Sequence, residues 1–271
     1  MSEREGSQRE RARSEPGTGS PVLDVRGLGR RFGGLQALSD VSFTVPPGRT
    51  LGIIGPNGAG KSTFINLVTG HIRPTSGRVL IDGRDMTGAR PWSVARAGVA
   101  RTFQIVKPFR GMTVRENVAV GILYGPEGTG VMSHALTAAD EVLEQVGLGA
   151  LADRSPGALT VADARRLELA KALALRPRLL LLDEVMAGLR HREIEPSLAL
   201  IDSLKAQGMT IIAVEHVMKA IVAISDEVLV LHQGRVLTSG EPDTVLSDPR
   251  VIEAYLGQRY VKRQQAVSPD A

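Results

Sequence analysis

Residues 55–63 read GPNGAGKST, the stretch of the chain that most strongly indicates its fold. It satisfies the pattern G-x-x-x-x-G-K-[ST], with the apolar segment LGII before it and the segment FINLVT after it. A buried strand, a glycine-rich loop and a helix are therefore expected in succession, which is the context of a nucleotide-binding phosphate loop. A glycine-rich turn that merely begins a helix is the alternative, and the companion motifs below argue against it.

The loop contains the residue types that bind polyphosphate. Its glycines let bare backbone approach the phosphates, so that N–H groups and the N-terminus of the helix face their charge. Lys61 is expected to reach the β- and γ-phosphates, Ser62 to bind Mg²⁺ and Thr63 to contact the α-phosphate. ATP and Mg²⁺ are the expected cofactors. The predicted loop consists of Gly55, Pro56, Asn57, Gly58, Ala59, Gly60, Lys61, Ser62 and Thr63.

The composition of the 271 residues is that of a globular protein. The hydrophobic fraction of 42% suffices for a sizeable core, and no apolar run reaches the ~18 residues of a membrane span. Cysteine is absent, which excludes disulfides, and the N-terminal segment has no apolar core of a signal peptide. A cytoplasmic protein is therefore expected. The net charge of +4 arises from interspersed acids and bases with 3% aromatics, which argues against nucleic acid as a partner.

The order of polar and apolar segments predicts one folded domain, 21–258, between two polar tails. Residues 1–20 are expected to be disordered, and 259–271 form the second tail. Short alternating strands near the phosphate loop contrast with apolar strands that suit a parallel sheet covered on both faces. Helical spacing of apolar residues predicts a helical insertion over about 112–175. The expected fold is an α/β, P-loop NTPase core with an antiparallel β edge and a helical subdomain. The apolar strands are 179–184, 210–216 and 227–232.

Two adjacent carboxylates, Asp183 and Glu184, follow four leucines. An apolar strand that ends in two acids is the expected partner of a phosphate loop. Asp183 would hold Mg²⁺ through water, and Glu184 would polarise the water that attacks the γ-phosphate, a role worth ~10²–10⁴-fold in rate. Acids at solvated strand ends are common, so the pair alone is equally compatible with a structural role. The presence of Lys61 favours catalysis.

These motifs, in this order, resemble the ATP-binding subunit of an ABC transporter over about 22–257. The resemblance implies an ABC-type ATP-binding domain with further site residues. Phe32 matches the aromatic that stacks on adenine, Gln104 the glutamine that senses the γ-phosphate and Mg²⁺, and His216 the switch histidine that contacts the γ-phosphate. A core phenylalanine and a structural strand-end histidine are the alternatives for Phe32 and His216.

Shorter phrases are similar to one class of this family, the importers of branched-chain amino acids. Within that class the chain is similar to the larger of two ATP-binding subunits. The resemblance implies a separate membrane permease, a second ATP-binding subunit and, indirectly, an external solute-binding protein as partners. It places the chain on the inner face of the cell membrane. Related systems carry other amino acids, amides or urea. The phrases are GGLQAL (33–38), VARTFQ (99–104), PFRGMTVRENV (108–118) and DPRVIEAYLG (248–257).

The family signature, normally LSGGQ, departs from its pattern here. In a dimer of this family the segment faces the γ-phosphate bound to the opposite subunit, so the departure affects the partner's site. The T-x-x-D pattern predicts a helix cap that engages the threonine hydroxyl. The acid adds a repulsion of ~1 kcal/mol in water for charges about 4 Å apart. A weakened partner site and an unlike second ATP-binding subunit are expected. The altered residues are Thr160, Val161, Ala162 and Asp163.

A second departure follows Glu184, because Arg190 stands where the family has an aspartate; a solvated loop arginine is the alternative. With Lys61 and Glu184 intact, an asymmetric dimer with one strong site is expected.

Two other functions stay open. An ABC-type ATPase of nucleic-acid repair or translation usually fuses two ATPase units or adds a coiled coil, and the sequence has no heptad run. A regulatory protein that binds ATP and barely hydrolyses it is compatible with the altered signature.

Overall fold

The structure, a computed structural model, describes residues 20–256 except 105, 127, 129 and 216. The two predicted tails, apart from Ser20, and His216 therefore lie outside the described residues. The strands are β1 (Leu23–Phe32), β2 (Leu35–Val45), β3 (Thr50–Ile54), β4 (Ser76–Ile81), β5 (Arg84–Asp85), β6 (Val99–Arg101), β7 (Leu179–Asp183), β8 (Thr210–Val214), β9 (Glu227–His232) and β10 (Arg235–Gly240). The α helices are α1 (Lys61–Val68), α2 (Pro91–Arg96), α3 (Val114–Tyr124), α4 (Met132–Gln145), α5 (Val161–Leu173), α6 (His191–Ala206), α7 (Met218–Ile224), α8 (Pro242–Leu246) and α9 (Pro249–Leu256).

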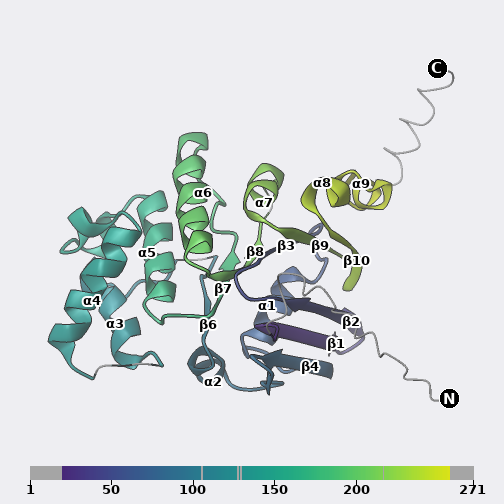
Figure 1. The fold of residues 1–271 in the computed structure, drawn as a ribbon, viewed down its shortest axis with the longest axis horizontal. Helices are drawn as coiled ribbons and strands as arrows, with labels where there is room; N and C mark the ends of the chain where they lie inside the picture. Colours follow the sequence, from purple (N-terminus) through teal and green to yellow (C-terminus); the bar gives the residue numbers. More distant parts are fainter. Residues whose placement is uncertain (1–19, 105, 127, 129, 216, 257–271) are drawn as a thin grey trace, which may run out of the picture.

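The described strands form two sheets (Figure 1). The larger has the order β10-β9-β3-β8-β7-β6, and its strands are parallel except for β10, which pairs antiparallel with β9. The predicted parallel core is thereby confirmed, although its antiparallel edge is β10 and not the alternating strands near the phosphate loop from which an edge was expected. The alternating strands near the phosphate loop form a second, antiparallel sheet of order β2-β1-β4-β5.

Strand β7 shows why the larger sheet needs cover on both faces. Leu179 and Leu181 belong to a buried cluster with the antiparallel sheet and α1, whereas Leu180 and Leu182 belong to a cluster with helices α3 to α7. Successive side chains of a strand point to opposite faces, so a run of leucines is stable only between two layers. Helix α1 consequently lies between the two sheets, with Phe64 fully buried.

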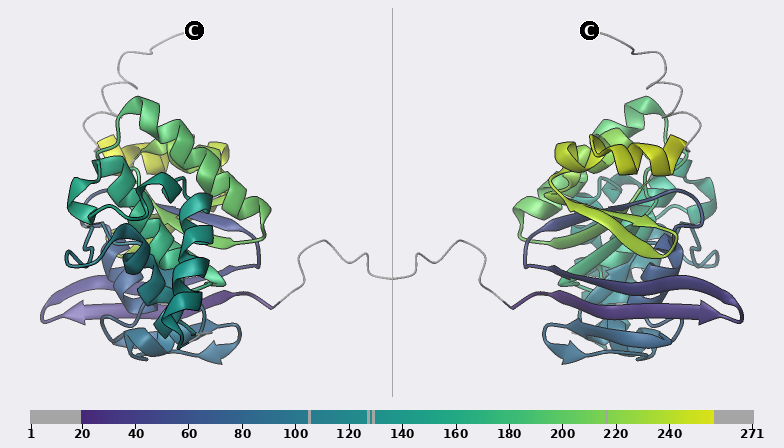
Figure 2. Two further views of the ribbon diagram at one scale, coloured as in Figure 1. Left: turned by 90° about the vertical axis from the view of Figure 1, so that its left-hand side faces the viewer. Right: turned by 90° about the vertical axis from the view of Figure 1, so that its right-hand side faces the viewer.

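The helical layer of α3, α4 and α5 lies between β6 and β7 in the sequence, within the stretch expected to be helical. It forms one end of the molecule in Figure 1 and faces the viewer in the left view of Figure 2. Helix α3 begins with a capping box, in which Thr113 Oγ1 accepts from Glu116 N at 3.1 Å and Glu116 Oε2 accepts from Thr113 N at 2.7 Å. No helix within the described ranges is both long and apolar enough to span a bilayer.

The turn between β9 and β10 joins the two sheets at the phosphate loop. Gly234 N donates to Ala59 O at 3.0 Å, and Ser39 N donates to Gly234 O at 2.7 Å. Gly234 has a φ of +75°, and a Cβ there would lie 2.6 Å from Ala37 O. Glycine is needed at this position because the backbone is left-handed and the neighbouring strand is too close for a side chain.

We predict that Gly234→Ala lowers the free energy of unfolding more than Gly83→Ala does. Gly83 has a φ of +74° with no described atom within 4 Å of a built Cβ, so the two substitutions share the backbone cost of roughly 1–2 kcal/mol. The clash at Gly234 should add at least about 1 kcal/mol. Urea unfolding of both variants measures the difference. Equal free energies would show that the turn does not pack on the phosphate loop as described.

Candidate nucleotide-binding site

The backbone of the phosphate loop is shaped by two of its glycines. A Cβ on Gly55 would lie 2.1 Å from Leu231 O, and one on Gly60 would lie 2.8 Å from Ala37 O. Gly60, at φ 107°, precedes helix α1 and no described side chain caps this helix. The N–H groups of its first turn are therefore available to an anion, as in a phosphate-binding helix N-terminus.

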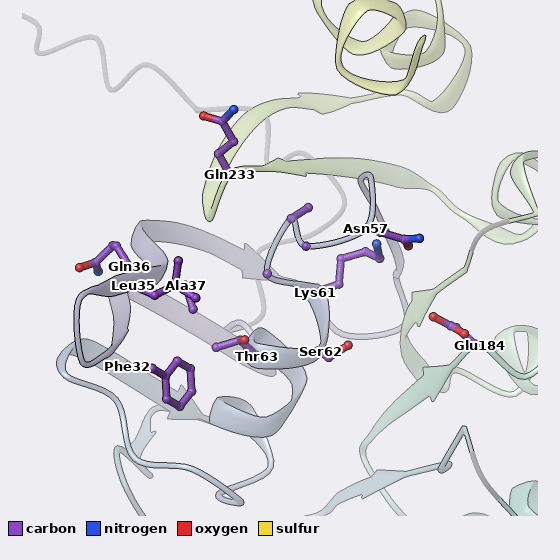
Figure 3. Close-up of a pocket in the computed structure, with 13 residues that line it drawn as sticks. Phe32, Leu35, Gln36, Ala37, Asn57, Lys61, Ser62, Thr63, Glu184 and Gln233 are labelled. Carbon is purple, nitrogen blue, oxygen red and sulfur yellow. The ribbon is translucent and has the colours of Figure 1, made fainter. Parts of the chain in front are cut away.

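A pocket of about 530 Å³ lies over this loop (Figure 3). Phe32 and Glu184 stand at opposite ends of it, with Lys61 between them. The pocket thus offers an aromatic ring at one end and a cation beside a carboxylate at the other, which suits the base and the phosphates of a nucleotide. The lining residues are Phe32, Leu35, Gln36, Ala37, Asn57, Gly58, Ala59, Gly60, Lys61, Ser62, Thr63, Glu184 and Gln233.

The Lys61 ammonium group is held inside the loop itself. The side chain is 7% exposed, and Nζ donates to Gly55 O at 2.6 Å and to Pro56 O at 3.2 Å. Burial lowers the pKa of Lys61, and the carboxylates of Glu184 and Asp183 offset part of this lowering. The cation is therefore placed in advance at the position where the motif requires it, close to both predicted acids.

Glu184 has an uncommon backbone conformation that places its side chain in the pocket. Its φ of 52° lies in the left-handed region, which non-glycine residues adopt mainly where the surroundings impose it. Here Glu184 N donates to Val214 O at 2.8 Å, and Ala187 N donates to Glu184 O at 3.2 Å. Gln104 Nε2 donates to Glu184 Oε2 at 2.5 Å. The structure thus brings together two of the predicted catalytic residues from separate segments.

Asp183 is paired with an arginine that the sequence reasoning did not single out. Arg101 Nη2 donates to Asp183 Oδ2 at 2.7 Å, and both side chains are largely buried. Thr102 Oγ1 accepts a hydrogen bond from Asp183 N at 3.1 Å. The signal available in the sequence was a charged residue at the end of an apolar segment, inside the phrase VARTFQ. Charged residues are rarely buried without a partner. A buried arginine at this position therefore indicated that an acidic residue lies nearby.

The predicted cap of the altered signature is confirmed. Thr160 precedes α5, and its Oγ1 accepts from Asp163 N at 3.1 Å and donates to Asp163 Oδ2 at 2.7 Å. The hydroxyl is therefore engaged within its own helix. Arg166 lies 3.8 Å from the other oxygen of Asp163, which offsets part of the added negative charge. Val161 projects from the same turn and is 63% exposed.

The structure distinguishes between the alternatives for two further residues. Phe32 is 42% exposed, with the Arg30 guanidinium carbon 4.5 Å from its ring centre, so it is not a core phenylalanine. Arg190 is an exposed loop residue whose backbone N donates to Glu193 Oε2 at 2.8 Å at the start of α6. Gln233 also lines the pocket. It was not predicted from the sequence, because its position in a turn was the only available indication.

Comparisons with known proteins agree with this geometry. Residues 38–187 match the family described as ABC transporter. The chain belongs to the ABC transporter family. Residues 235–261 match the family described as branched-chain amino acid ATP-binding cassette transporter. The family and fold predicted from the sequence are thus confirmed, and the chain is an ATP-hydrolysing subunit of that family. The roles of its individual site residues stay predictions.

Two relatives and one solved structure are similar over most of the chain. The high-affinity branched-chain amino acid transport ATP-binding proteins BraF of Pseudomonas aeruginosa and LivG of Escherichia coli are each 40% identical over 251 residues, which is 88% of this chain and 98% of theirs. The ADP conformation of MJ1267, an ATP-binding cassette of an ABC transporter, has 31% identity and a TM-score of 0.80, covering 89% of this chain and all of that one.

We predict that Lys61→Ala weakens ATP binding by roughly 10- to 100-fold, since a hydrogen bond to a charged group contributes about 1.5–3 kcal/mol. Titration of the purified chain with a fluorescent ATP analogue measures this loss. Lys219→Ala, which removes an exposed lysine outside the pocket, is the matched control and should bind like the unaltered chain. Undiminished affinity in Lys61→Ala would mean that ATP binds elsewhere.

Proposed function

We propose that this chain is the larger ATP-binding subunit of an importer of branched-chain amino acids or related small polar solutes. The observation that carries the proposal is the similarity to BraF and LivG, which extends over 98% of their length. The match at 235–261 supports it independently, because it covers a different part of the chain from the ATP-binding motifs. The chain would act on a separate permease, with the solute recognised by the permease and an external binding protein.

The predicted magnesium ligands fit that ion chemically. Ser62, Gln104 and Asp183 offer hydroxyl, amide and carboxylate oxygens, the hard donors that Mg²⁺ prefers. Asp183 forms an ion pair with Arg101 through Oδ2, which leaves Oδ1 as the carboxylate oxygen that would hold a water of the ion. When bound, Mg²⁺ would neutralise charge on the β- and γ-phosphates.

The proposed mechanism follows from the pairings of the described side chains. Lys61 would exchange the carbonyls of Gly55 and Pro56 for phosphate oxygens, gaining charge-assisted hydrogen bonds. Glu184 would polarise the attacking water. Because Gln104 donates to Glu184, a movement of Gln104 on nucleotide binding would alter the placement of the general base. Closure and opening of the ATPase dimer would then change the conformation of the permease, and the chain would sit peripherally on the inner face of the membrane.

The second ATP-binding subunit is proposed to be unlike this chain. The Thr160 hydroxyl that would contact the partner's γ-phosphate is committed to Asp163, and the signature lacks both glycines. This chain's signature therefore offers fewer contacts to the partner's γ-phosphate than the family pattern does. Its own phosphate loop keeps every expected residue. Two copies of this chain would have two weakened sites, whereas a dimer with an unlike subunit keeps one strong site.

The similarity to transport proteins favours this proposal over an ATPase of nucleic-acid repair or translation. A purely regulatory ATP-binding protein would show no steady turnover in the assembled complex, whereas the proposed subunit turns over ATP in a manner that depends on Lys61.

We predict that tagged Glu184→Gln protein, in Mg·ATP, captures its complex from native membrane extract. Loss of the general base should stall hydrolysis and hold the closed assembly. Mass spectrometry should then identify a polytopic permease and a second, distinct ATP-binding subunit. Lys61→Ala bait, which should not close around ATP, is the control and should recover less of both. Recovery of only soluble or ribosomal proteins with Glu184→Gln would overturn the transport function.

We predict unequal hydrolysis at the two sites of the assembled dimer. The two sites can be compared in a single-turnover assay in which the subunits are distinguished by labelling. The site on the partner's phosphate loop, which this chain's signature completes, should produce the smaller share of the ADP. Replacing Val161 and Ala162 by glycine should raise mainly that share and leave the site on this chain's own phosphate loop unchanged. Equal contributions from both sites of the unaltered complex would refute the asymmetry.

A further inference from the structure

Arg101 joins two elements of the site with one side chain. It is the last residue of β6 and lies opposite Leu181 of β7, two residues before Asp183. Its side chain is 12% exposed. Nη2 donates to Asp183 Oδ2 at 2.7 Å, and Nη1 donates to Asn66 Oδ1 on α1 at 2.7 Å. The planar guanidinium fixes the angle between these two bonds, which a lysine ammonium group on a flexible stem does not.

The acceptor on α1 relates this contact to the phosphate loop. Asn66 stands four residues after Ser62 on the same helix, and residues at this spacing share one helix face. A side chain that holds Asn66 therefore fixes the rotation and position of the face that carries Ser62. The other end of the guanidinium holds Asp183. One side chain thus sets the spacing between two of the three predicted magnesium ligands.

The third predicted ligand follows Arg101 in the chain. The guanidinium carbon lies 5.1 Å from the ring centre of Phe103, a cation–π contact, and Gln104 is the next residue. Arg165 from α5 donates to the backbone carbonyl of Gln104. Arg101 consequently contacts all three segments that supply the predicted ligands: α1, the end of β7 and the chain at 102–104.

We infer that Arg101 is a positioning residue for the magnesium ion of Mg·ATP, acting through Asp183 and α1. The inference rests on the proposed function, because it takes Ser62, Gln104 and Asp183 as the magnesium ligands. Arg101 occupies Oδ2 of Asp183, and no residue in the described part of the chain hydrogen-bonds Oδ1. The pairing therefore presents Oδ1 to a water of the ion. It also supplies the countercharge that the Asp183 carboxylate needs, because that side chain is only 8% exposed.

The test compares ATP binding with and without Mg²⁺, so that effects on the metal are separated from effects on the nucleotide. Arg101→Lys keeps the charge and loses the planar fork. Its affinity for ATP in EDTA should stay within about twofold of the unaltered chain. The gain in affinity on adding Mg²⁺ should fall by about 10-fold, as is typical when a residue that orients a metal ligand is lost. Fluorescent ATP titrations at a series of Mg²⁺ concentrations measure both quantities.

Two further variants separate the bridge to α1 from the buried ion pair. Asn66→Ala removes one acceptor and spares the buried ion pair, so it should fold and show a smaller loss of the magnesium-dependent gain. The double variant should lose no more than Arg101→Lys alone, because both substitutions remove the same bridge. Arg178→Lys is the matched control. Arg178 Nη1 lies 2.9 Å from Asp82 Oδ2, and neither residue lines the nucleotide pocket. The Arg178→Lys variant should leave both affinities unchanged.

Three other outcomes would each exclude a different role. A full magnesium-dependent gain in both Arg101→Lys and Asn66→Ala would overturn the role of Arg101. A full gain in Asp183→Asn would overturn the magnesium role of Asp183 and the inference with it, while leaving the transport function standing. Failure of the unaltered chain to bind ATP in either condition would contradict the proposed function itself.

Discussion

The order of strands in the larger sheet is the constraint on which the rest of the site depends. Strands β3 and β7 are parallel and have only β8 between them, so their carboxyl ends lie at the same edge. The phosphate loop leaves one strand and the acids leave the other. Residues 122 positions apart, Lys61 and Asp183, are thereby brought together at the edge where open α/β sheets bind ligands.

Charge balance explains how the site is stable before it binds a nucleotide. Lys61 and Arg101 are basic, Asp183 and Glu184 are acidic, and the low exposure of Lys61, Arg101 and Asp183 makes an unpaired charge at any of these three costly. Each has a partner within the protein: a loop carbonyl for Lys61, an ion pair for Arg101 and Asp183, and an amide for Glu184. Nucleotide binding can proceed by exchange of these partners, so the pocket need not be rebuilt.

Local patterns in the sequence predicted much of the fold and site, whereas contacts between distant segments were not predicted. The phosphate loop, the four leucines of β7 and the T-x-x-D cap depend on residues close in sequence, where spacing and side-chain type suffice. The separate antiparallel sheet was not predicted, because pairing of β1 with β4 depends on how the whole chain is arranged. The bridge from Arg101 to Asn66 depends on the order of β6, β7 and α1 in space, which no local pattern contains.

The most direct measurement is a crystal structure of the Glu184→Gln variant with Mg²⁺ and ATP. We predict the triphosphate on residues 55–63, with Lys61 Nζ moved from the Gly55 carbonyl to phosphate oxygens. The metal should lie between Ser62 and Asp183. A nucleotide bound outside this pocket, or a bound nucleotide that leaves Lys61 hydrogen-bonded to Gly55, would show that this loop does not bind the triphosphate as proposed.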